Sequence, residues 1–233
     1  MGALIAAPSV LGSTVVILDG KHFRIQRRPF TLYVAQDALN GKPFAWILLE
    51  RYELRKGYDV ILKYCRRKNL RIEAVISDWH HGIRASLAQW YPEAIHQRCA
   101  AHVLQDALRK LGGQWFLGWD MGRNLWQEFV TVALRHQSLT EAQRHLNSLK
   151  DPLRVIHAKQ LEALLILEAA LVDIYAWTQN RQLPIPRTSN RIESLMGVIE
   201  QRLKVCRGFQ NPKTLLAIIS TLLILKYQLP TKR

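Results

Sequence analysis

Apolar positions in the first fifty residues recur with the spacing of β-strands. Residues 14–18 form a β-branched run that ends in Asp19 and Gly20, which predicts a buried strand with an acid at its end. Asp-Gly is also a strong hairpin signal, so the alternative interpretation of Asp19 is a turn residue. Further strand-like segments follow at 23–27, 30–36 and 44–49. The simplest account is three antiparallel strands in a row, preceded by a loose arm at 1–12.

The hydrophobic period then changes to that of a helix. Within residues 51–68, one helical face carries Leu54, Tyr58, Ile61, Leu62 and Cys65. Residues 72–77 return to a strand pattern and again end in an acid, Asp78. Ser77 and Asp78 would equally well cap the next helix. The elements that follow are a helix at 82–90, a short strand at 95–98 and a helix that ends near 111.

From Gly112 onward the pattern predicts helix after helix until the breakers Pro184 and Pro186. The predicted helices are 123–136, 140–150 and 153–180, followed after the breakers by 190–206 and 212–227. Thr140 with Gln143 is a capping-box signal for the second of them. Strands that alternate with helices predict a mixed α/β sheet with helices on its faces. If the strands before Asp19 and Asp78 are parallel neighbours, both acids lie at one sheet edge, where such sheets bind ligands.

The segment that follows the proline breakers contains a third acid of interest. Asn190 stands where a helix should start, and Glu193 falls in its first turn, at the positive end of the helix dipole. A carboxylate there can face a metal ion or a phosphate-bearing partner. The plainer interpretation is a capping box, because Asn and Glu have the spacing of one. Our hypothesis is that Glu193 completes a site begun by Asp19 and Asp78.

The charge of the chain points to a polyanionic partner. The 233 residues include 33 Lys and Arg against 18 Asp and Glu, a net charge of +15. This excess favours nucleic acid ahead of an acidic membrane, with a basic ribosomal or soluble protein as the alternative. Three scattered cysteines, Cys65, Cys99 and Cys206, are not a disulfide framework and fit a reducing compartment.

Neither a signal peptide nor a membrane span is expected. The N-terminus has no basic region before its apolar residues. The apolar stretch at 161–175 is interrupted by acids, and that at 214–225 is shorter than the ~18 residues a span needs. We therefore expect buried helices in a soluble, cytoplasmic protein that is associated with the nucleoid when it binds DNA.

Three carboxylates in one place suggest metal-dependent phosphodiester chemistry. Two Mg²⁺ or Mn²⁺ ions ~3.5–4 Å apart can activate a nucleophile and stabilise the charge on the phosphate and the leaving oxygen. Such hard cations prefer oxygen ligands. Clustered carboxylates without metal would repel one another, so the cluster itself implies cations.

Three segments of the chain resemble the catalytic region of Mutator-type DDE transposases of insertion sequences. The first is residues 17–24, which contains Asp19. The second runs from 75–78 through Gly82-Ile83 and 91–94 to 97–102, and ends in a Cys-x-x-His pair. The third is residues 188–195, which contains Glu193 and is followed by Arg202, Lys204, Arg207 and Gly208.

This resemblance implies an RNase H-like fold, with a five-stranded mixed sheet and an all-helical insertion before the last acid. We expect a first core part at 13–111, the insertion at 112–186 and the C-terminal core helices at 187–229. The metal-binding acids of the family correspond to Asp19, Asp78 and Glu193, with two Mg²⁺ or Mn²⁺ ions. The implied activity is cleavage of double-stranded DNA at terminal inverted repeats and joining of the 3′ hydroxyls to target DNA, by analogy as a homodimer.

The resemblance has departures. Trp79 follows Asp78 where the family usually has a small residue, and Met196 stands where Asn is common. The DNA-binding domain that such enzymes usually carry does not precede Val15, which would fit a fragment or a shortened copy. The alternatives to a transposase are an inactive or domesticated DNA-binding derivative and an RNase H-like endonuclease without joining activity.

Other candidate site residues are weaker. Cys99 and His102 invite a zinc interpretation, but paired ligand spacing is missing, and a supporting role beside the acids, shared with Asn190, is the preferred hypothesis. Trp119 or Trp126 would stack on an unpaired base, although most Trp residues are core. The clusters Lys63/Arg66/Arg67/Lys68 and Arg202/Lys204/Arg207 are solvated faces or DNA contacts. The full set of predicted DNA contacts is Lys21, Arg24, Arg98, Arg191, Arg202, Lys204 and Arg207.

Overall fold

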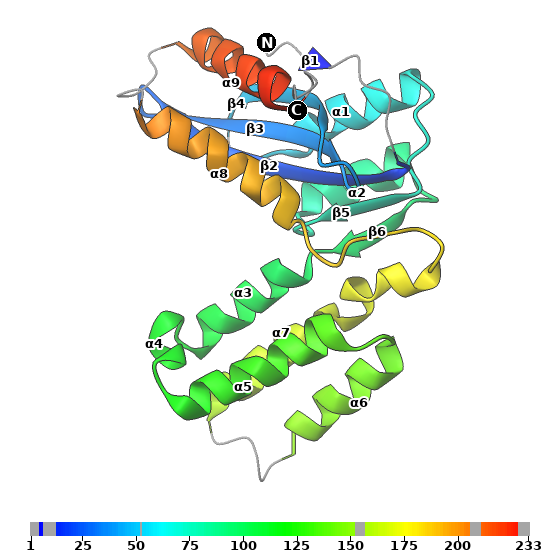
Figure 1. Ribbon diagram of the computed structural model, residues 1–233, viewed down its shortest axis with the longest axis vertical. Coiled ribbons are helices and arrows are strands. Elements are labelled where there is room, and N and C mark those ends of the chain that lie inside the picture. Colours follow the sequence, from blue (N-terminus) through cyan, green and yellow to red (C-terminus); the bar gives the residue numbers. More distant parts are fainter. Residues whose placement is uncertain (1–4, 7–12, 52, 152–156, 206–210, 228–233) are drawn as a thin grey trace, which may run out of the picture. The chain divides into compact units, whose positions relative to one another are not determined.

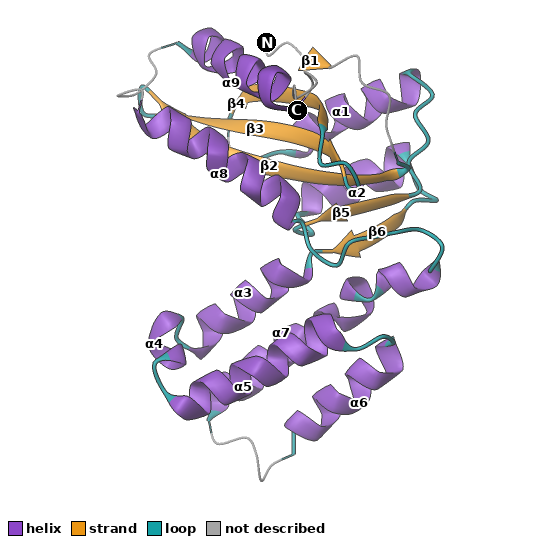
Figure 2. Cartoon of the chain, in the orientation of Figure 1, coloured by secondary structure: helices purple, strands orange, loops and turns teal. Residues whose placement is uncertain are grey.

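The chain folds into two compact units. The computed structural model describes residues 5–6, 13–51, 53–151, 157–205 and 211–227. One unit combines Met1–Ile95 with Ser189–Arg233 and contains most of the β-sheet; we call it the sheet unit. The other, His96–Thr188, consists almost entirely of helices and is called the helical unit. Figure 2 shows this division, with strands confined almost wholly to the sheet unit.

The sheet has the order β1-β4-β3-β2-β5-β6 and is mixed (Figure 1). β2 pairs antiparallel with β3 and parallel with β5, and β3 pairs antiparallel with β4. This confirms the predicted mixed sheet flanked by helices. The two-residue strand β1, inside the segment expected to be a loose arm, adds a sixth strand by pairing with β4. The strands are β1 (Ile5–Ala6), β2 (Val15–Ile25), β3 (Arg28–Asp37), β4 (Pro43–Glu50), β5 (Ala74–Ser77) and β6 (Ile95–Arg98).

The first hairpin lies further along the chain than the Asp-Gly signal suggests. β2 continues without a break through Asp19 and Gly20, so the turn interpretation of Asp19 was wrong. The chain turns at Gln26 and Arg27, which have φ angles of 50° and 66°. Two residues with positive φ form the tight turn whose twist suits a two-residue hairpin loop. The acid therefore lies inside a long strand, where neighbours on both sides fix its direction.

Helices cover both faces of the sheet. The helices α1 (Arg55–Arg67) and α2 (His81–Trp90) pack on one face, where Val16 and Leu18 of β2 join Ile61 and Ile83 in one buried cluster. On the other face, α8 (Asn190–Val205) contacts β2, and α9 (Pro212–Tyr227) contacts β4 (Figure 1). Trp46 of β4 is fully buried and donates a 2.9 Å hydrogen bond to the Ser220 hydroxyl of α9.

The helix after β4 begins later than its hydrophobic pattern predicts. α1 starts at Arg55 rather than near residue 51. The backbone N–H of Leu54 donates to the Tyr33 hydroxyl at 2.8 Å, and Arg51 has a positive φ of 148°. Both features are incompatible with helical geometry at Arg51 and Leu54, so α1 cannot begin before Arg55. As a result, Glu53 lies in a loop and turns toward the interior, where its side chain is 11% exposed.

The helical unit has its own core. Buried side chains from α3 (Ala100–Leu111), α5 (Asp120–Val130), α6 (Leu139–Leu149) and α7 (Ala158–Ile174) form one cluster. α3 packs along α7, and the unit begins at His96, so it includes α3 together with the segment predicted as the insertion at 112–186. Short elements complete it: α4 (Gln114–Leu117), a π-helix at Thr131–Arg135 and a 3₁₀ helix at Ala176–Gln179. In place of the long helix predicted at 153–180, the described residues form α7, which ends at Ile174, and then the 3₁₀ helix.

The cap of α6 lies two residues before the predicted capping box. The Ser138 hydroxyl accepts a hydrogen bond from the N–H of Glu141, and the Glu141 carboxylate accepts one from the N–H of Gln137. These two hydrogen bonds satisfy backbone N–H groups on either side of the N-cap residue. Of the cysteines, Cys65 and Cys99 are buried outside any disulfide, and Cys206 lies outside the described residues. Within the described helices, none combines the length and apolar character of a membrane span.

Candidate active site

Asp19 and Asp78 follow equivalent positions on two neighbouring parallel strands. In the ladder between β2 and β5, Ile17 pairs with Ile76. Asp19 and Asp78 each come two residues later in the chain. Because parallel strands in register advance together, the two acids reach the same end of this strand pair. Two residues that are far apart in sequence therefore follow equivalent positions at one end of neighbouring strands.

The side chain of Asp19 lies on the side of the sheet that α8 covers. Successive residues of a strand point to opposite faces. Gly20 faces α1, because a Cβ there would lie 2.8 Å from the Tyr58 hydroxyl. Asp19 and Lys21 consequently share the opposite face, and the Lys21 ammonium lies 3.1 Å from Glu200 of α8.

Two contacts hold α8 along β2 and place Glu193 between them. The Arg191 guanidinium donates to the carbonyl of Ala38, which lies just after β3, at 2.9 Å. Glu200, further along α8, meets Lys21 of β2. Glu193 and Glu200 are two helical turns apart and so share a face of α8. The third acid therefore lies on the helix face directed at β2, on the same side of the sheet as Asp19.

Each of the three carboxylates is oriented by a local hydrogen bond. One oxygen of Asp19 accepts from the N–H of Gly20 at 2.8 Å, and one oxygen of Asp78 accepts from the backbone two residues on at 3.0 Å. One oxygen of Glu193 accepts from the Ser189 hydroxyl at 3.1 Å. These bonds fix the carboxylate planes before any ligand arrives.

The start of α8 differs in detail from the predicted capping box. Asn190 is the first helical residue and is exposed. The carbonyl of Ser189 accepts the hydrogen bond from the N–H of Glu193 at 3.2 Å, so Ser189 holds the cap position. Glu193 thus has a local structural contact in addition to its proposed role.

The turn after β5 adopts a strained conformation. Trp79 has a φ of 74°, in the left-handed region that favours glycine. Its N–H donates to the Ser77 hydroxyl at 3.1 Å, and the Arg84 guanidinium lies 5.3 Å from the centre of its ring. Glycine would avoid this strain, because it has no Cβ to clash in the left-handed region. The strain is located at the residue that follows Asp78.

The structure adds an acid that the sequence pattern did not reveal. Glu53 accepts a hydrogen bond from the Tyr58 hydroxyl and lies 3.5 Å from His22 and 3.7 Å from His80. Burial raises the pKa of Glu53, and the negative charge of Asp78 raises it further. The hydrogen bond from Tyr58 and the two imidazoles act in the opposite direction.

The pKa of the Tyr58 phenol depends on the charges of the predicted acids. Its pKa is raised well above the usual value, first by burial and then by Glu53, Asp78 and Asp19. The charges of Asp19 and Asp78 therefore act on one buried phenol, which agrees with their placement at the same end of the strands. Loop position and the absence of a motif explain why Glu53 could not be identified from sequence.

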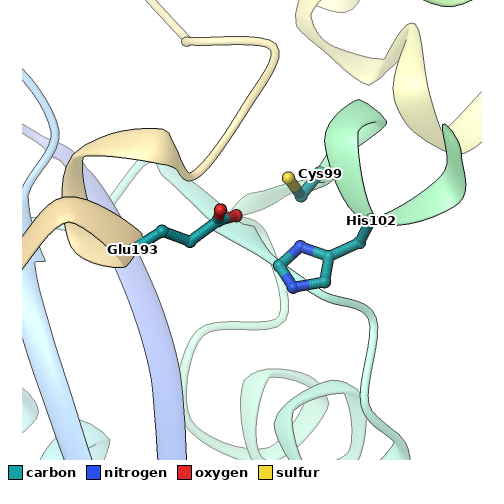
Figure 3. A group of neighbouring side chains, drawn as sticks. All are labelled: Cys99, His102 and Glu193. Atoms are coloured by element: carbon teal, nitrogen blue, oxygen red, sulfur yellow. The ribbon is translucent and has the colours of Figure 1, made fainter. Parts of the chain in front are cut away.

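Cys99 and His102 belong to the helical unit and occupy the start of α3 (Figure 3). Cys99 is the fully buried N-cap residue, and His102 lies in the first turn. The next residue, Ala100, donates its N–H to the carbonyl of Arg187 at 3.0 Å. The predicted strand-end and helix-start positions of the pair are thus observed. Glu193, also drawn in Figure 3, belongs to the sheet unit.

The predicted DNA contacts occupy different environments. Arg24 and Arg202 are exposed on the sheet unit, whereas Lys21 and Arg191 make the contacts that hold α8. Arg98 lies on the helical unit beside a groove between α3 and α7. The side chain of Lys204 and all of Arg207 lie outside the described residues. Exposed arginines are therefore the better candidates for contact with a DNA backbone.

The two tryptophans proposed to stack on a base also differ. The Trp119 side chain is 59% exposed and makes an edge contact with Trp115, which is 71% exposed. Trp126 packs against the core of the helical unit, with its ring 6.5 Å from that of Phe129. Exposed aromatic rings are suited to base stacking, so Trp119 is the stronger of the two candidates.

The donor atoms at the acids suit a hard divalent cation. Asp19, Asp78 and Glu193 offer carboxylate oxygens, the ligands that Mg²⁺ and Mn²⁺ prefer. Within the described residues, these three acids do not form a group of ligand atoms within 4.8 Å of one another.

The strand order and the helices on both faces of the sheet give the mixed α/β architecture that the sequence pattern predicts. A family model described as Transposase, Mutator family, matches residues 47–228, well over half of the chain. The chain belongs to the Mutator family of transposases. The matched region contains Asp78 and Glu193, whereas Asp19 lies before it.

Solved structures also show similarity to this chain. One is a cryo-EM structure of the simian T-cell lymphotropic virus intasome in complex with PP2A regulatory subunit B56 gamma, with 12% identity, a TM-score of 0.30 and 57% of this chain covered. This chain spans 52% of that one, about half its length. Another is the HTLV-2 integrase catalytic core domain in complex with magnesium, with 11% identity, a TM-score of 0.29, and coverage of 55% and 90% of the two chains. No curated protein matches.

Proposed function

We propose that this protein cleaves double-stranded DNA at the terminal inverted repeats of a mobile element and joins the freed 3′ hydroxyls to target DNA. Asp19, Asp78 and Glu193 are the catalytic acids, and they hold two Mg²⁺ or Mn²⁺ ions. The observation that carries the proposal is the parallel register of β2 and β5, which takes Asp19 and Asp78 to one end of the strand pair. Membership of the Mutator family supports the same reaction.

The residues of the chain have distinct roles in this proposal. Asp19 and Asp78 supply oxygen ligands that local hydrogen bonds have already oriented. Glu193 adds a ligand from the first turn of α8, where the helix dipole also favours the phosphate of the substrate. Bound divalent cations would supply charge stabilisation and an activated nucleophile.

Residues outside the acid cluster would hold the DNA. Arg24 and Arg202 would contact the phosphate backbone, Trp119 would stack on an unpaired base at the cleavage point, and His102 would contact a phosphate or order a water molecule. Neutralising Arg202 should weaken DNA binding and make its salt dependence shallower, because fewer counterions are released. A homodimer is expected, since two element ends must be processed together.

The test is Mg²⁺-dependent joining of a labelled 3′-OH DNA end by the full chain. Asp19→Asn, Asp78→Asn and Glu193→Gln should each abolish joining while the fold and DNA affinity are kept. Glu93→Gln is the matched control, because Glu93 is an exposed carboxylate of the same unit. Cleavage without joining in the unaltered protein would favour an endonuclease. DNA binding without cleavage would favour a non-catalytic derivative.

A further inference from the structure

Two histidines of the helical unit face each other through their ring nitrogens. His136 follows the π-helix, and His145 lies in α6. The Nε2 atom of His136 is 2.9 Å from the Nδ1 atom of His145, and the ring planes are 87° apart. At this distance the two nitrogens share one proton, because two protonated nitrogens would repel each other. One ring therefore donates its N–H to the lone pair of the other, and the two inner nitrogens face each other across a short contact.

The outer nitrogens of the two rings face carboxylates. His145 Nε2 lies 2.9 Å from an oxygen of Glu128, and His136 Nδ1 lies 3.9 Å from an oxygen of Glu141. The 2.9 Å contact with Glu128 favours the proton on Nε2 of His145, which leaves the lone pair of its Nδ1 directed at His136 and makes that nitrogen a stronger ligand. The order carboxylate, imidazole, imidazole, carboxylate is the outer arrangement of many metal-binding histidines.

The loop that carries His136 is held in place before any ligand binds. The N–H of Gln137 donates to the Glu141 carboxylate at 3.1 Å, and the carbonyl of Gln137 accepts from the Arg181 guanidinium at 3.2 Å. The Ser138 cap then fixes the start of the helix that carries His145. Both imidazoles therefore come from firmly positioned backbone, although their side chains remain 25% and 20% exposed.

The spacing of the inner nitrogens is close to that of a zinc site. Two nitrogens ~2.0–2.1 Å from a tetrahedral ion stand ~3.3–3.4 Å apart. The observed 2.9 Å is shorter by a few tenths of an ångström, so metal binding would separate the rings and turn both lone pairs toward the ion. Imidazole nitrogens select Zn²⁺, Ni²⁺ or Cu²⁺ over Mg²⁺, and water would supply the further ligands, because both side chains are partly exposed.

We propose that His136 and His145 form a binding site for a borderline divalent transition metal such as Zn²⁺, with Glu128 and Glu141 as the carboxylates behind them. Binding releases the proton that the two imidazoles share and replaces it with the ion. The site joins the segment after the π-helix to α6, and its residues differ from the acids proposed to act on DNA. The bound ion would link these two segments of the helical unit.

The test is equilibrium dialysis of the full chain against Zn²⁺ in excess Mg²⁺, which occupies hard oxygen sites. The unaltered protein should hold one Zn²⁺ per chain more than His136→Gln or His145→Gln, in which affinity for this ion should fall at least tenfold. Glutamine retains polar atoms near the flanking carboxylates, and circular dichroism checks folding. Zinc bound elsewhere, at Cys99 and His102 for example, is unaffected and cancels in the comparison.

A second measurement reads the ligands directly. Electron paramagnetic resonance of the Cu²⁺-loaded chain should show coupling to two imidazole nitrogens, reduced to one in either variant. The matched control is His157→Asn, because His157 is exposed in the same unit and asparagine suits its position before α7. Equal zinc stoichiometry and affinity in unaltered and variant proteins, or a copper spectrum that the variants leave unchanged, would overturn the proposal.

Discussion

The sheet unit and the helical unit each gather potential metal ligands, but of opposite chemical character. At the sheet, Asp19 and Asp78 reach the same end of a strand pair because β2 and β5 pair in parallel register, and Glu193 lies on the helix that contacts β2. In the helical unit, two imidazoles nine positions apart meet through one turn between helices. Oxygen ligands suit Mg²⁺, which serves phosphoryl transfer, whereas nitrogen ligands suit Zn²⁺, which serves structure. Donor type therefore separates the two proposed functions.

The largest effect should appear when a variant that disables only the acid site is compared with one that disables only the histidine site. Asp78→Asn should lower Mg²⁺-dependent joining on the order of 10³-fold, because a metal ligand contributes several kcal/mol to the transition state. The same variant should keep the zinc equivalent assigned to His136 and His145. His145→Gln should show the reverse pattern. Joining assays and dialysis on both variants provide the measurement, and loss of both properties in either variant would contradict their independence.

A second prediction concerns the packing beside Asp19. Gly20→Ala should destabilise the protein by about 1–3 kcal/mol, because the added Cβ would lie within 3.0 Å of Tyr58 and Glu53. Denaturant unfolding measures this change. Gly113→Ala is a poor control because of its positive φ, whereas Gly197, with nothing within 4 Å of an added Cβ, is suitable. Equal stability of Gly20→Ala and Gly197→Ala would show that the contact at Gly20 relaxes easily.

A third prediction concerns the strained turn after Asp78. Trp79→Gly should be more stable than Trp79→Ala by about 1 kcal/mol, because only glycine adopts a φ of 74° without cost. Comparing these two variants removes the contribution of the ring, which both have lost. Thermal unfolding in the absence of divalent metal is the measurement. If alanine is as stable as glycine, the turn is not strained in solution.

The smallest effect should be the pH dependence caused by Glu53. Its raised pKa means that the folded protein keeps this proton above the pH at which the unfolded chain releases it. Stability is therefore lost as pH rises from the usual pKa of glutamic acid through the raised value. Glu53→Gln should remove this loss, so its advantage over the unaltered protein should grow with pH. The measurement is metal-free unfolding at several pH values. If the difference in stability between Glu53→Gln and the unaltered protein does not change with pH, burial does not raise the pKa of Glu53.

The sequence predicted the features that depend on periodicity. The strands before Asp19 and Asp78 and the helix that begins at Asn190 were all identified from apolar spacing and breakers, and their arrangement in a mixed sheet was confirmed. The Asp-Gly pair was ambiguous because its turn propensity competes with the β-branched run before it. The ladder to β3, which spans the whole of β2, resolved this competition in favour of the strand.

Features that depend on tertiary contacts were not accessible from sequence. Glu53 faces the interior because the Tyr33 hydroxyl delays the start of α1, and no local pattern encodes that contact. The pairing of His136 with His145 requires the turn capped by Ser138, two residues before the box that the sequence suggested. Isolated acids and histidines carry little information until a fold brings their side chains together.

The most direct test of the central claim is a crystal structure of the protein soaked in Mn²⁺. Anomalous scattering identifies each ion without ambiguity. The account predicts manganese bound by Asp19, Asp78 and Glu193, with both ions in contact with carboxylate oxygens of this set. Manganese absent from these residues, with Glu193 directed away from the other two acids, would contradict it.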